Sequence, residues 1–211
     1  MRIYACSSNP GKLREFSLAG RQSGIPDLDI RPLPGLPHIS PPDETGTTFE
    51  QNAAAKAAYY SRYSDELVLA DDSGLVVPAL GGAPGTYSSR YAGPDATSAD
   101  NNALLLRNLT GIENRSAYFV CVVALARFSQ VLTTCRGTVD GQILHEAVGA
   151  HGFGYDPLFF YPPLNATFAV LEDRQKFAVS HRGAALRNLF LWLDRSQGRL
   201  RRDHQCSGTL R

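Results

Sequence analysis

The chain has 211 residues, of which 43% are apolar and 19% charged, and its formal net charge at pH 7 is +1. This length suffices for one domain, or one domain with two lobes, and the composition is typical of a globular chain rather than a disordered one. A net charge near zero argues against a protein that holds nucleic acid by bulk electrostatics. An anionic ligand would therefore be held locally, by a few residues at defined positions.

The cysteines and the hydropathy pattern indicate a soluble protein. Cys6 and Cys121 lie in apolar, strand-like runs, and none of the four cysteines has the spacing of a CxxC pair or a zinc site. The opening stretch MRIYACSS enters a short strand and lacks the apolar region of a signal peptide. No apolar run approaches the roughly 20 residues that cross a bilayer. We therefore expect buried free thiols, no membrane partner and a location in the reducing cytoplasm.

Strands and helices alternate along the chain, with one long hairpin among them. The elements predicted for the first half are a strand at 2–6, a turn at 7–12 that leads into a helix, a short strand at 28–30, a proline-rich connector at 31–42, a helix at 47–64 and a strand at 67–71. Those predicted for the second half are a glycine-rich loop at 78–94, a helix at 98–109, a hairpin with strands at 117–128 and 131–141, a glycine-rich loop at 149–157, a short strand at 158–161 and a last helix that Ser180 caps. This order predicts an α/β protein with a mixed sheet, and such folds bind ligands in glycine-rich loops at strand ends.

Three boundaries follow from local patterns. Thr47 and Glu50 have the spacing of a capping box at the start of the second helix. Ser129 and Gln130 are the predicted turn of the hairpin. After Ser196 the chain has no apolar periodicity, so we expect a domain of residues 1–195 and a basic, mobile tail of residues 196–211.

The turn SSNPGK, residues 7–12, is a candidate anion site. Ser7, Ser8 and Asn9 stand between a strand and a helix, where hydroxyls, an amide and backbone N–H groups can face an anion. Lys12 falls in the first turn of that helix, whose positive dipole end adds to the attraction. The spacing is not that of a P-loop. A polar capping turn with a solvated lysine explains the same residues, and spacing alone slightly favours it.

The segment ETGTTFEQNAAAK supplies polar residues before and on the second helix. Asn52 and Lys56 are four residues apart, so they share one helix face, away from the apolar stripe. Glu44 stands just before the helix, in a loop. Ordinary surface residues are an equally good explanation for Asn52.

The stretch LADDSGL, residues 69–75, places two carboxylates side by side at the end of an apolar run. Because neighbouring side chains of a strand point to opposite faces, Asp71 and Asp72 need not contact the same ligand. One can bind a metal or activate water while the other braces the loop. The alternative is an Asx turn in which both carboxylates cap local N–H groups. A turn does not require two like charges, so we favour a catalytic or metal-binding role for this pair over a purely structural one. We also infer that their repulsion is offset only when a cation arrives with the substrate.

The last candidate pairs HGFGYDP with the downstream KFAVSHRG. Phe153 and Tyr155 on a glycine-rich loop can stack on a flat base, and Asp156 can accept hydrogen bonds from it. One of the two aromatic residues is expected to belong to the core. Lys176, His181 and Arg182 add cationic groups near the last helix. Together the four stretches suit a nucleoside triphosphate held with Mg²⁺, which prefers one or two carboxylates plus substrate phosphates.

These motifs, in this order, resemble the inosine triphosphate pyrophosphatase family of nonstandard purine nucleoside triphosphate pyrophosphatases. The resemblance runs from about Ile3 to Leu193. It is carried by SSNPGK, ETGTTFEQNAAAK, LADDSGLVVPALGGAPGTYSSRYAG, FGYDPLFF and SHRGAAL. It implies an elongated mixed α/β sheet flanked by helices, with two lobes and the active-site cleft between them. It also implies a homodimer that hydrolyses ITP, dITP and XTP to the monophosphate and pyrophosphate and so cleanses the nucleotide pool.

The resemblance further assigns roles to residues. Glu44 and Asp72 would hold Mg²⁺, and Asp72 would be the general base. The groups that would bind the triphosphate are Ser7, Ser8, Asn9, Pro10, Gly11 and Lys12, with Lys56 assisting and Ser73 touching the substrate. Those that would enclose and read the base are Phe153, Gly154, Tyr155, Asp156, Lys176, His181 and Arg182. Ser8 stands where the family usually has glycine, which bears on affinity rather than on activity.

Three other functions remain open from the sequence. A related pyrophosphatase with Maf-like specificity for dTTP or modified pyrimidines would share the architecture. A non-catalytic nucleotide sensor would have little use for Glu44 and Asp72 together. A nucleic-acid role for the arginine-rich tail is the weakest of the three.

Overall fold

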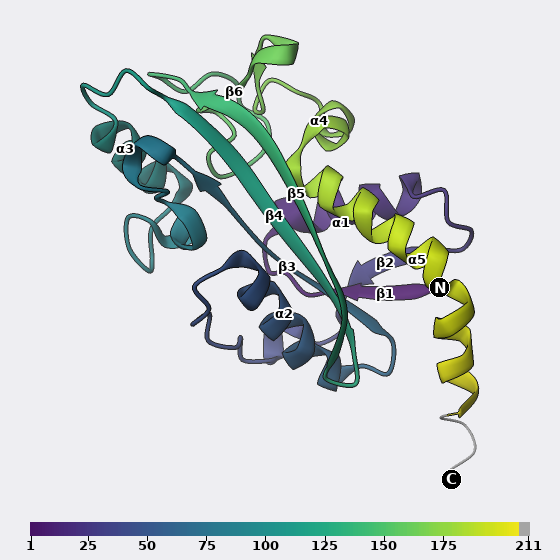
Figure 1. The fold of residues 1–211 in the computed structure, drawn as a ribbon. Helices are drawn as coiled ribbons and strands as arrows, with labels where there is room; N and C mark the ends of the chain where they lie inside the picture. Colours follow the sequence, from purple (N-terminus) through teal and green to yellow (C-terminus); the bar gives the residue numbers. More distant parts are fainter. Residues whose placement is uncertain (207–211) are drawn as a thin grey trace.

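Seven strands form one mixed sheet with the strand order β2-β1-β3-β4-β5-β6-β7 (Figure 1). The computed structural model describes residues 1–206, with side chains described as far as residue 196. The strands are β1 (Arg2–Ala5), β2 (Asp29–Pro32), β3 (Leu67–Val76), β4 (Ser116–Arg127), β5 (Gln130–Ile143), β6 (Phe159–Tyr161) and β7 (Ala166–Thr167). β1 runs parallel to β2 and β3, and the remaining neighbours are antiparallel, so the sheet is mixed as predicted.

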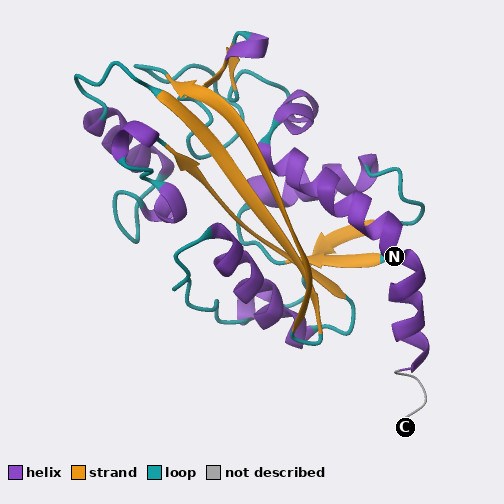
Figure 2. Cartoon of the chain, viewed as in Figure 1, coloured by secondary structure: helices purple, strands orange, loops and turns teal. Residues whose placement is uncertain are grey.

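Helices cover both faces of this sheet (Figure 2). The α-helices are α1 (Pro10–Gln22), α2 (Phe49–Tyr60), α3 (Ser98–Asn108), α4 (Asp173–Val179) and α5 (His181–Cys206). Short 3-10 turns are η1 (Leu36–His38), η2 (Ser61–Tyr63), η3 (Pro78–Leu80), η4 (Gly85–Arg90) and η5 (Pro162–Leu164). α2 packs on one face of β3 and β4, whereas α5 packs on β4 and β5 from the other. Because β3 and β4 are covered on both faces, most of their residues are buried, and β4 reads as a continuous apolar run rather than an alternating one.

Three apolar clusters divide the molecule into two lobes. One cluster lies between α1, α5 and the sheet, and includes Phe16, Leu69 and Leu189. A second lies under α2. The third joins α3 to the distal ends of β3, β4 and β5, and includes Leu105 and Phe159. The expected two-lobed α/β architecture is therefore confirmed. The first two clusters belong to the first lobe, and the third cluster belongs to the second lobe.

Four boundaries differ from those expected from the sequence. Thr48, not Thr47, caps α2 by accepting the N–H of Gln51, so the predicted Thr47–Glu50 capping box is wrong. The hairpin turns at Phe128 and Ser129, which both have positive φ and so match the twist of the two strands. β3 continues to Val76 through DDSG instead of ending there, because β4 pairs with it along this whole stretch. α5 continues to Cys206, beyond the predicted domain end at residue 195, because this stretch contains no proline to break the helix. Residues 207–211, also assigned to the tail, lie outside the described residues.

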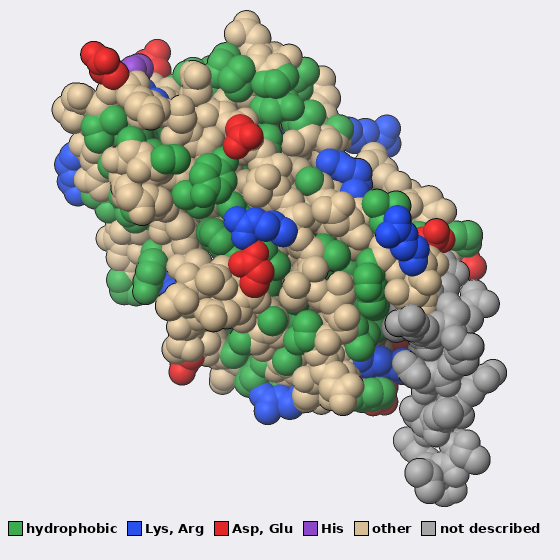
Figure 3. Space-filling view, in the orientation of Figure 1, with side chains coloured by type: hydrophobic (Ala, Val, Ile, Leu, Met, Phe, Trp, Pro, Cys, Tyr) green, Lys and Arg blue, Asp and Glu red, His purple; other side chains and the backbone are tan. Residues whose placement is uncertain are grey.

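The charge distribution on the surface and the state of the cysteines agree with what the near-zero net charge and the cysteine spacing predicted. Acidic and basic side chains are scattered over the face in Figure 3 without a patch of one sign. Cys6, Cys121 and Cys135 are free thiols, and the first two are buried. Within the described part of the chain, no helix is long and apolar enough to cross a membrane.

Gly74 lets the η4 turn rest directly on β3. A Cβ atom at this position would overlap the carbonyl oxygen of Gly85 and the Oγ of Ser88. Ser88 Oγ in turn accepts the N–H of Leu75 at 2.9 Å and donates to the Gly85 carbonyl at 2.6 Å. The missing side chain therefore allows the second lobe to be hydrogen-bonded to the central strand.

Gly74→Ala is expected to lower the free energy of unfolding by about 1–3 kcal/mol, because the added methyl group meets backbone that cannot move aside. Urea denaturation measures the loss. Gly20→Ala in α1 is the control, since the nearest atom there is the flexible Ile30 Cγ1 at 3.2 Å. Alanine in a helix should be neutral or stabilising by up to about 1 kcal/mol. Equal losses in the two variants would contradict the close approach at Gly74.

Candidate active site

β3 carries the two adjacent aspartates in regular strand backbone. Asp71 pairs with Val123 of β4, and Asp72 pairs with Val122. Neighbouring side chains of a strand point to opposite faces, so Asp71 points toward α1 and α5, and Asp72 toward α2. The two carboxylates therefore enter two separate networks of charge.

Asp71 is enclosed by cations. Lys12 Nζ lies 3.1 Å from its Oδ1 and 3.0 Å from its Oδ2, and Arg182 donates to Oδ2 at 3.1 Å. Burial alone would raise the pKa of Asp71, but the charges of Lys12 and Arg182 outweigh it and hold this pKa well below its usual range. Asp71 is therefore a permanent anion that fixes two cations, which supports the brace expected from the sequence.

Asp72 has a different environment on the opposite face. Asn52 donates to its Oδ2 at 3.1 Å, and Lys56 donates to its Oδ1 at 3.1 Å. Burial raises the pKa of Asp72 by more than Lys56 and Asn52 lower it, and the nearby Glu44 adds to the rise. Two adjacent carboxyl groups with opposite pKa shifts can divide the work, one as a fixed anion and one as a proton acceptor.

The repulsion inferred from the sequence is already offset inside the protein. Asp71 has Lys12 and Arg182, and Asp72 has Lys56, so the inference that only a substrate-borne cation neutralises the pair is wrong. Lys56 and Asn52 reach the same carboxylate from α2, which confirms that they share one helix face.

Glu44 completes the network on the α2 side. Its Oε1 accepts from Lys56 at 2.7 Å, and its Oε2 accepts from Arg90 at 3.0 Å. Burial works to raise the pKa of Glu44, but Lys56 and Arg90 lower it further than burial raises it. Arg90 lies in η4, where neither spacing nor periodicity gave a signal.

Glu44 and Asp72 flank one ammonium group, so the protein holds their carboxylates close together. In the part of the chain that the structure describes, no three His, Cys, Asp or Glu side chains form a group that could hold a metal ion. Mg²⁺ in nucleotide enzymes commonly uses one or two carboxylates and fills its remaining positions with waters and substrate phosphates. The donor set therefore fits a magnesium ion bound together with a nucleotide, and does not fit a structural metal.

The turn before α1 is a helix cap as well as part of the site. Asn9 Oδ1 accepts the N–H groups of Gly11 at 2.8 Å and Lys12 at 3.1 Å, and Ser7 Oγ accepts the N–H of Asn9. Three backbone N–H groups of the turn that the sequence suggested for an anion are therefore already bonded within the protein. Asn9 and Lys12 line the cavity, whereas Ser7, Ser8, Pro10 and Gly11 are not part of its lining.

Glu15 links the first helix to the predicted base-reading residues. Its Oε1 lies 2.9 Å from Lys176 Nζ, and its Oε2 accepts from Arg182 at 2.5 Å. Lys176 also donates to Asp156 at 2.6 Å. Charges therefore alternate without a break through Lys12, Asp71, Arg182, Glu15, Lys176 and Asp156. Glu15 was not predicted as a site residue, although its spacing of three from Lys12 places both on one face of α1.

The glycine-rich loop after β5 is held by this network. Asp156 Oδ2 accepts the N–H of Phe153 at 2.7 Å, and the Lys176 ammonium lies 4.4 Å from the centre of the Phe153 ring. Tyr155 is buried in the second lobe and donates to the carbonyl of Ser88 at 2.8 Å. Tyr155 is thus the core member of the aromatic pair, as expected of one of them, and Phe153 faces the cavity.

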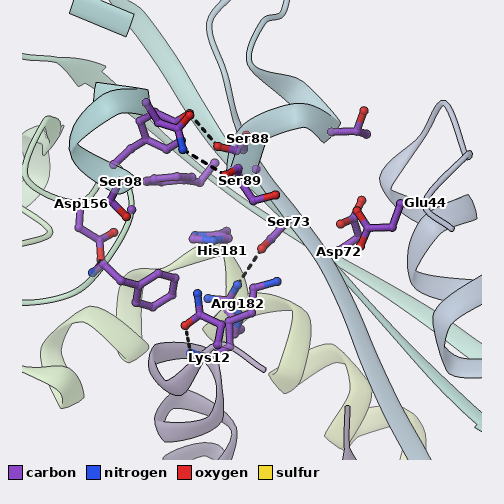
Figure 4. A pocket seen from close by; sticks show the side chains of 18 of the residues that line it. Lys12, Glu44, Asp72, Ser73, Ser88, Ser89, Ser98, Asp156, His181 and Arg182 are labelled. Carbon is purple, nitrogen blue, oxygen red and sulfur yellow. Dashed lines mark hydrogen bonds between the residues drawn. The ribbon is translucent and has the colours of Figure 1, made fainter. Parts of the chain in front are cut away.

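A cavity of about 270 Å³ joins the two ends of the site (Figure 4). The predicted residues that line it are Asn9, Lys12, Glu44, Lys56, Asp72, Ser73, Phe153, Gly154, Tyr155, Asp156, Lys176, His181 and Arg182. Lining residues that were not predicted from the sequence include Thr86, Ser88, Ser89, Ser98, Asn101 and Phe119. Figure 4 shows Glu44 and Asp72 at one end, Asp156 and Ser98 at the other, and His181 between them.

The chain is thus an α/β protein with an open mixed sheet and a charged cavity between its two lobes. The Ham1 family profile matches residues 3–192, and the chain belongs to this family. The dITP/XTP pyrophosphatase of Exiguobacterium sp. (strain ATCC BAA-1283 / AT1b) is 49% identical over 189 residues, covering 90% of this chain and 95% of the relative. That of Acidobacterium capsulatum is 46% identical over 198 residues, covering 90% of this chain and 96% of the relative.

Solved structures share the fold. The Ham1 protein of Staphylococcus aureus superposes with a TM-score of 0.79 at 38% identity, covering 92% of this chain and 98% of the other. A HAM1 protein from Coxiella burnetii gives a TM-score of 0.81 at 38% identity, covering 92% of this chain and 99% of the other. The resemblance inferred from the motifs is therefore confirmed over nearly the whole chain.

Glu15→Gln is expected to destabilise the fold by about 3–5 kcal/mol, because it leaves Lys176 and Arg182 buried with too little negative charge. Thermal and urea unfolding measure the change. Glu50→Gln is the matched control: Glu50 pairs with Arg136 at 2.5 Å, but both side chains are more than 40% exposed. Loss of an exposed pair should cost at most about 1 kcal/mol. A cost for Glu15→Gln as small as that of the control would contradict a structural role for the buried network.

Proposed function

We propose that this enzyme hydrolyses the nonstandard purine nucleoside triphosphates ITP, dITP and XTP to the monophosphate and pyrophosphate, with Mg²⁺. The observation that carries the proposal is one cavity whose lining includes Glu44, Lys56 and Asp72 as well as Phe153 and His181. Glu44 and Asp72 lie at one end of it, Asp156 at the other, and His181 between them. The curated relatives are named dITP/XTP pyrophosphatases, and the chain is an enzyme of the nucleoside-triphosphate pyrophosphatase class.

Asp72 is suited to be the general base at the phosphate end. It lines the cavity, is buried, and has a raised pKa, so it can take a proton more readily than Asp71. In the proposed reaction a water attacks the α-phosphorus in line and its proton passes to Asp72. The bond from the α-phosphorus to the bridging oxygen breaks, and pyrophosphate leaves with that oxygen.

Glu44 and Asp72 would hold Mg²⁺, which when bound offsets negative charge on the phosphate oxygens. Lys56 contacts both carboxylates with one ammonium group, whose third hydrogen remains for a phosphate oxygen. Lys12 contributes a second cation from the first turn of α1, fixed by Asp71. Such prearranged donors stabilise the charge that develops on the leaving group.

The base end favours a purine by shape and by hydrogen bonding. Phe153 offers an aromatic face that is fixed by Lys176 and by the first turn of α1, where a side chain at Gly11 would overlap its ring. ITP and XTP carry a 6-oxo group where ATP has an amino group. A pocket that donates a hydrogen bond to that oxygen leaves its donor unpaired against adenine and so rejects ATP.

Asp72→Asn should lower kcat by about 10²–10⁴-fold, the usual contribution of a general base, while nucleotide binding persists. Steady-state pyrophosphate release and equilibrium binding of ITP without metal separate the two effects. Asp65→Asn is the control, since Asp65 is an exposed aspartate outside the cavity lining. Turnover near the wild-type level in Asp72→Asn would remove Asp72 from the role of base.

A substrate panel tests the reaction itself. Pyrophosphate release from ITP and XTP should exceed that from ATP and dTTP by about 10²-fold or more in kcat/KM, and chelation of Mg²⁺ should abolish it. GTP shares the 6-oxo group, so its rejection in the same panel would have to act at the 2-amino position. Preference for dTTP would favour the pyrimidine alternative. Tight nucleotide binding without pyrophosphate release on any substrate would favour the sensor.

A further inference from the structure

His181 lines the cavity, and its ring nitrogen Nδ1 is buried in the protein interior. It is the first residue of α5, and its ring is buried. Burial, together with the positive charges of Arg182 and Lys176, lowers the pKa of His181 well below its ordinary value, so the imidazole is neutral and carries one N–H. The chemistry of this ring therefore depends on which nitrogen bears the hydrogen.

The surroundings favour the hydrogen on Nε2. Nδ1 is buried and has no hydrogen-bond partner among the described residues, whereas Nε2 is not one of the buried atoms without a partner. Because His181 lines the cavity, we infer that Nε2 is the ring nitrogen on the cavity side. A buried N–H without an acceptor is rarer in proteins than a buried acceptor that is not fully satisfied. His181 thus presents a donor to the cavity, and what that donor can reach is set by the plane of the ring.

Phe119 fixes that plane. Its ring lies parallel to the His181 ring, with 4.6 Å between centroids and 15° between planes. Behind it, Phe159 lies at 4.5 Å and Phe168 at 6.0 Å, so Phe119 is itself held by a buried aromatic cluster. Of these three phenylalanines, Phe119 is the one that lines the cavity.

The backbone of His181 is fixed from a second strand. A Cβ atom on Gly137 of β5 would overlap the carbonyl oxygen of His181 and the N–H of Ala185. The start of α5 therefore rests directly on β5, and the ring can move only by rotation about its side-chain torsions. Stacking on Phe119 opposes that rotation.

We propose that Phe119 is a positioning residue that sets the selectivity for 6-oxo purines by holding the His181 ring so that Nε2–H faces the base. This inference rests on the proposed function. A fixed donor finds the 6-oxo oxygen of hypoxanthine or xanthine and remains unpaired against the amino group of adenine. A ring that is free to rotate loses this penalty, so discrimination falls while hydrolysis continues.

The experiment compares Phe119→Leu with Phe159→Leu. Both changes remove one ring from the same cluster, but Phe159 does not line the cavity. Phe119→Leu should lower the ITP/ATP ratio of kcat/KM by about tenfold, whereas Phe159→Leu should leave it within about twofold. Phe119→Met, which keeps apolar volume without a flat ring, should behave like Phe119→Leu and serves if the leucine variant does not fold.

Nitrogen-15 NMR of the His181 imidazole gives a readout that a loss of stability alone would not move. In the wild-type enzyme and in Phe159→Leu the ring should show one neutral tautomer, protonated on Nε2, and in Phe119→Leu an average of the two. An unchanged ITP/ATP ratio and tautomer in folded Phe119→Leu or Phe119→Met, or equal changes in Phe159→Leu, would overturn the role of Phe119. A wild-type enzyme that does not prefer ITP to ATP would instead overturn the proposed function.

Discussion

The site depends on the alternation of side chains along β3. Because Asp71 and Asp72 are consecutive in an unbroken strand, they project to opposite faces of the sheet. Each meets a different helix and a different lysine, Lys12 of α1 and Lys56 of α2. A bulge or a slip of one residue would exchange the two roles, since register decides which carboxylate enters the cavity. The pairing with β4 through Val122 and Val123 fixes this register.

Charge in the site is balanced before any ligand binds. The carboxylates Glu15, Glu44, Asp71, Asp72 and Asp156 are each paired with at least one of the cations Lys12, Lys56, Arg90, Lys176 and Arg182. A triphosphate adds several negative charges to this arrangement, and burying them without further cations would be costly. Glu44 and Asp72, which both pair with Lys56, are carboxylates that could bind an additional cation next to the phosphates. The balance is thus a physical reason for the proposed dependence on Mg²⁺.

The two networks also connect the lobes. Lys176, which Glu15 of α1 holds, also pairs with Asp156 beside Tyr155 of the second lobe, and the Glu44 loop is joined to η4 through Arg90. Gly11, Gly74 and Gly137 allow elements to meet without intervening side chains at three points around the cavity. The cavity is therefore shaped by close backbone contacts and held by buried ion pairs, which together favour a preorganised site over one that forms only on binding.

Local sequence determined much of this protein. Periodicity identified the helices and main strands, and the motifs located most of the residues that line the cavity, because residue type and spacing report local geometry directly. The continuation of β3 through DDSG and the roles of Glu15, Arg90 and Phe119 were decided by tertiary structure. These depend on partners distant in the chain: β4 keeps β3 extended, Lys176 and Arg182 neutralise Glu15, and His181 stacks on Phe119. The sequence by itself shows which chemical groups are present, but only the packed sheet determines which of them are in contact.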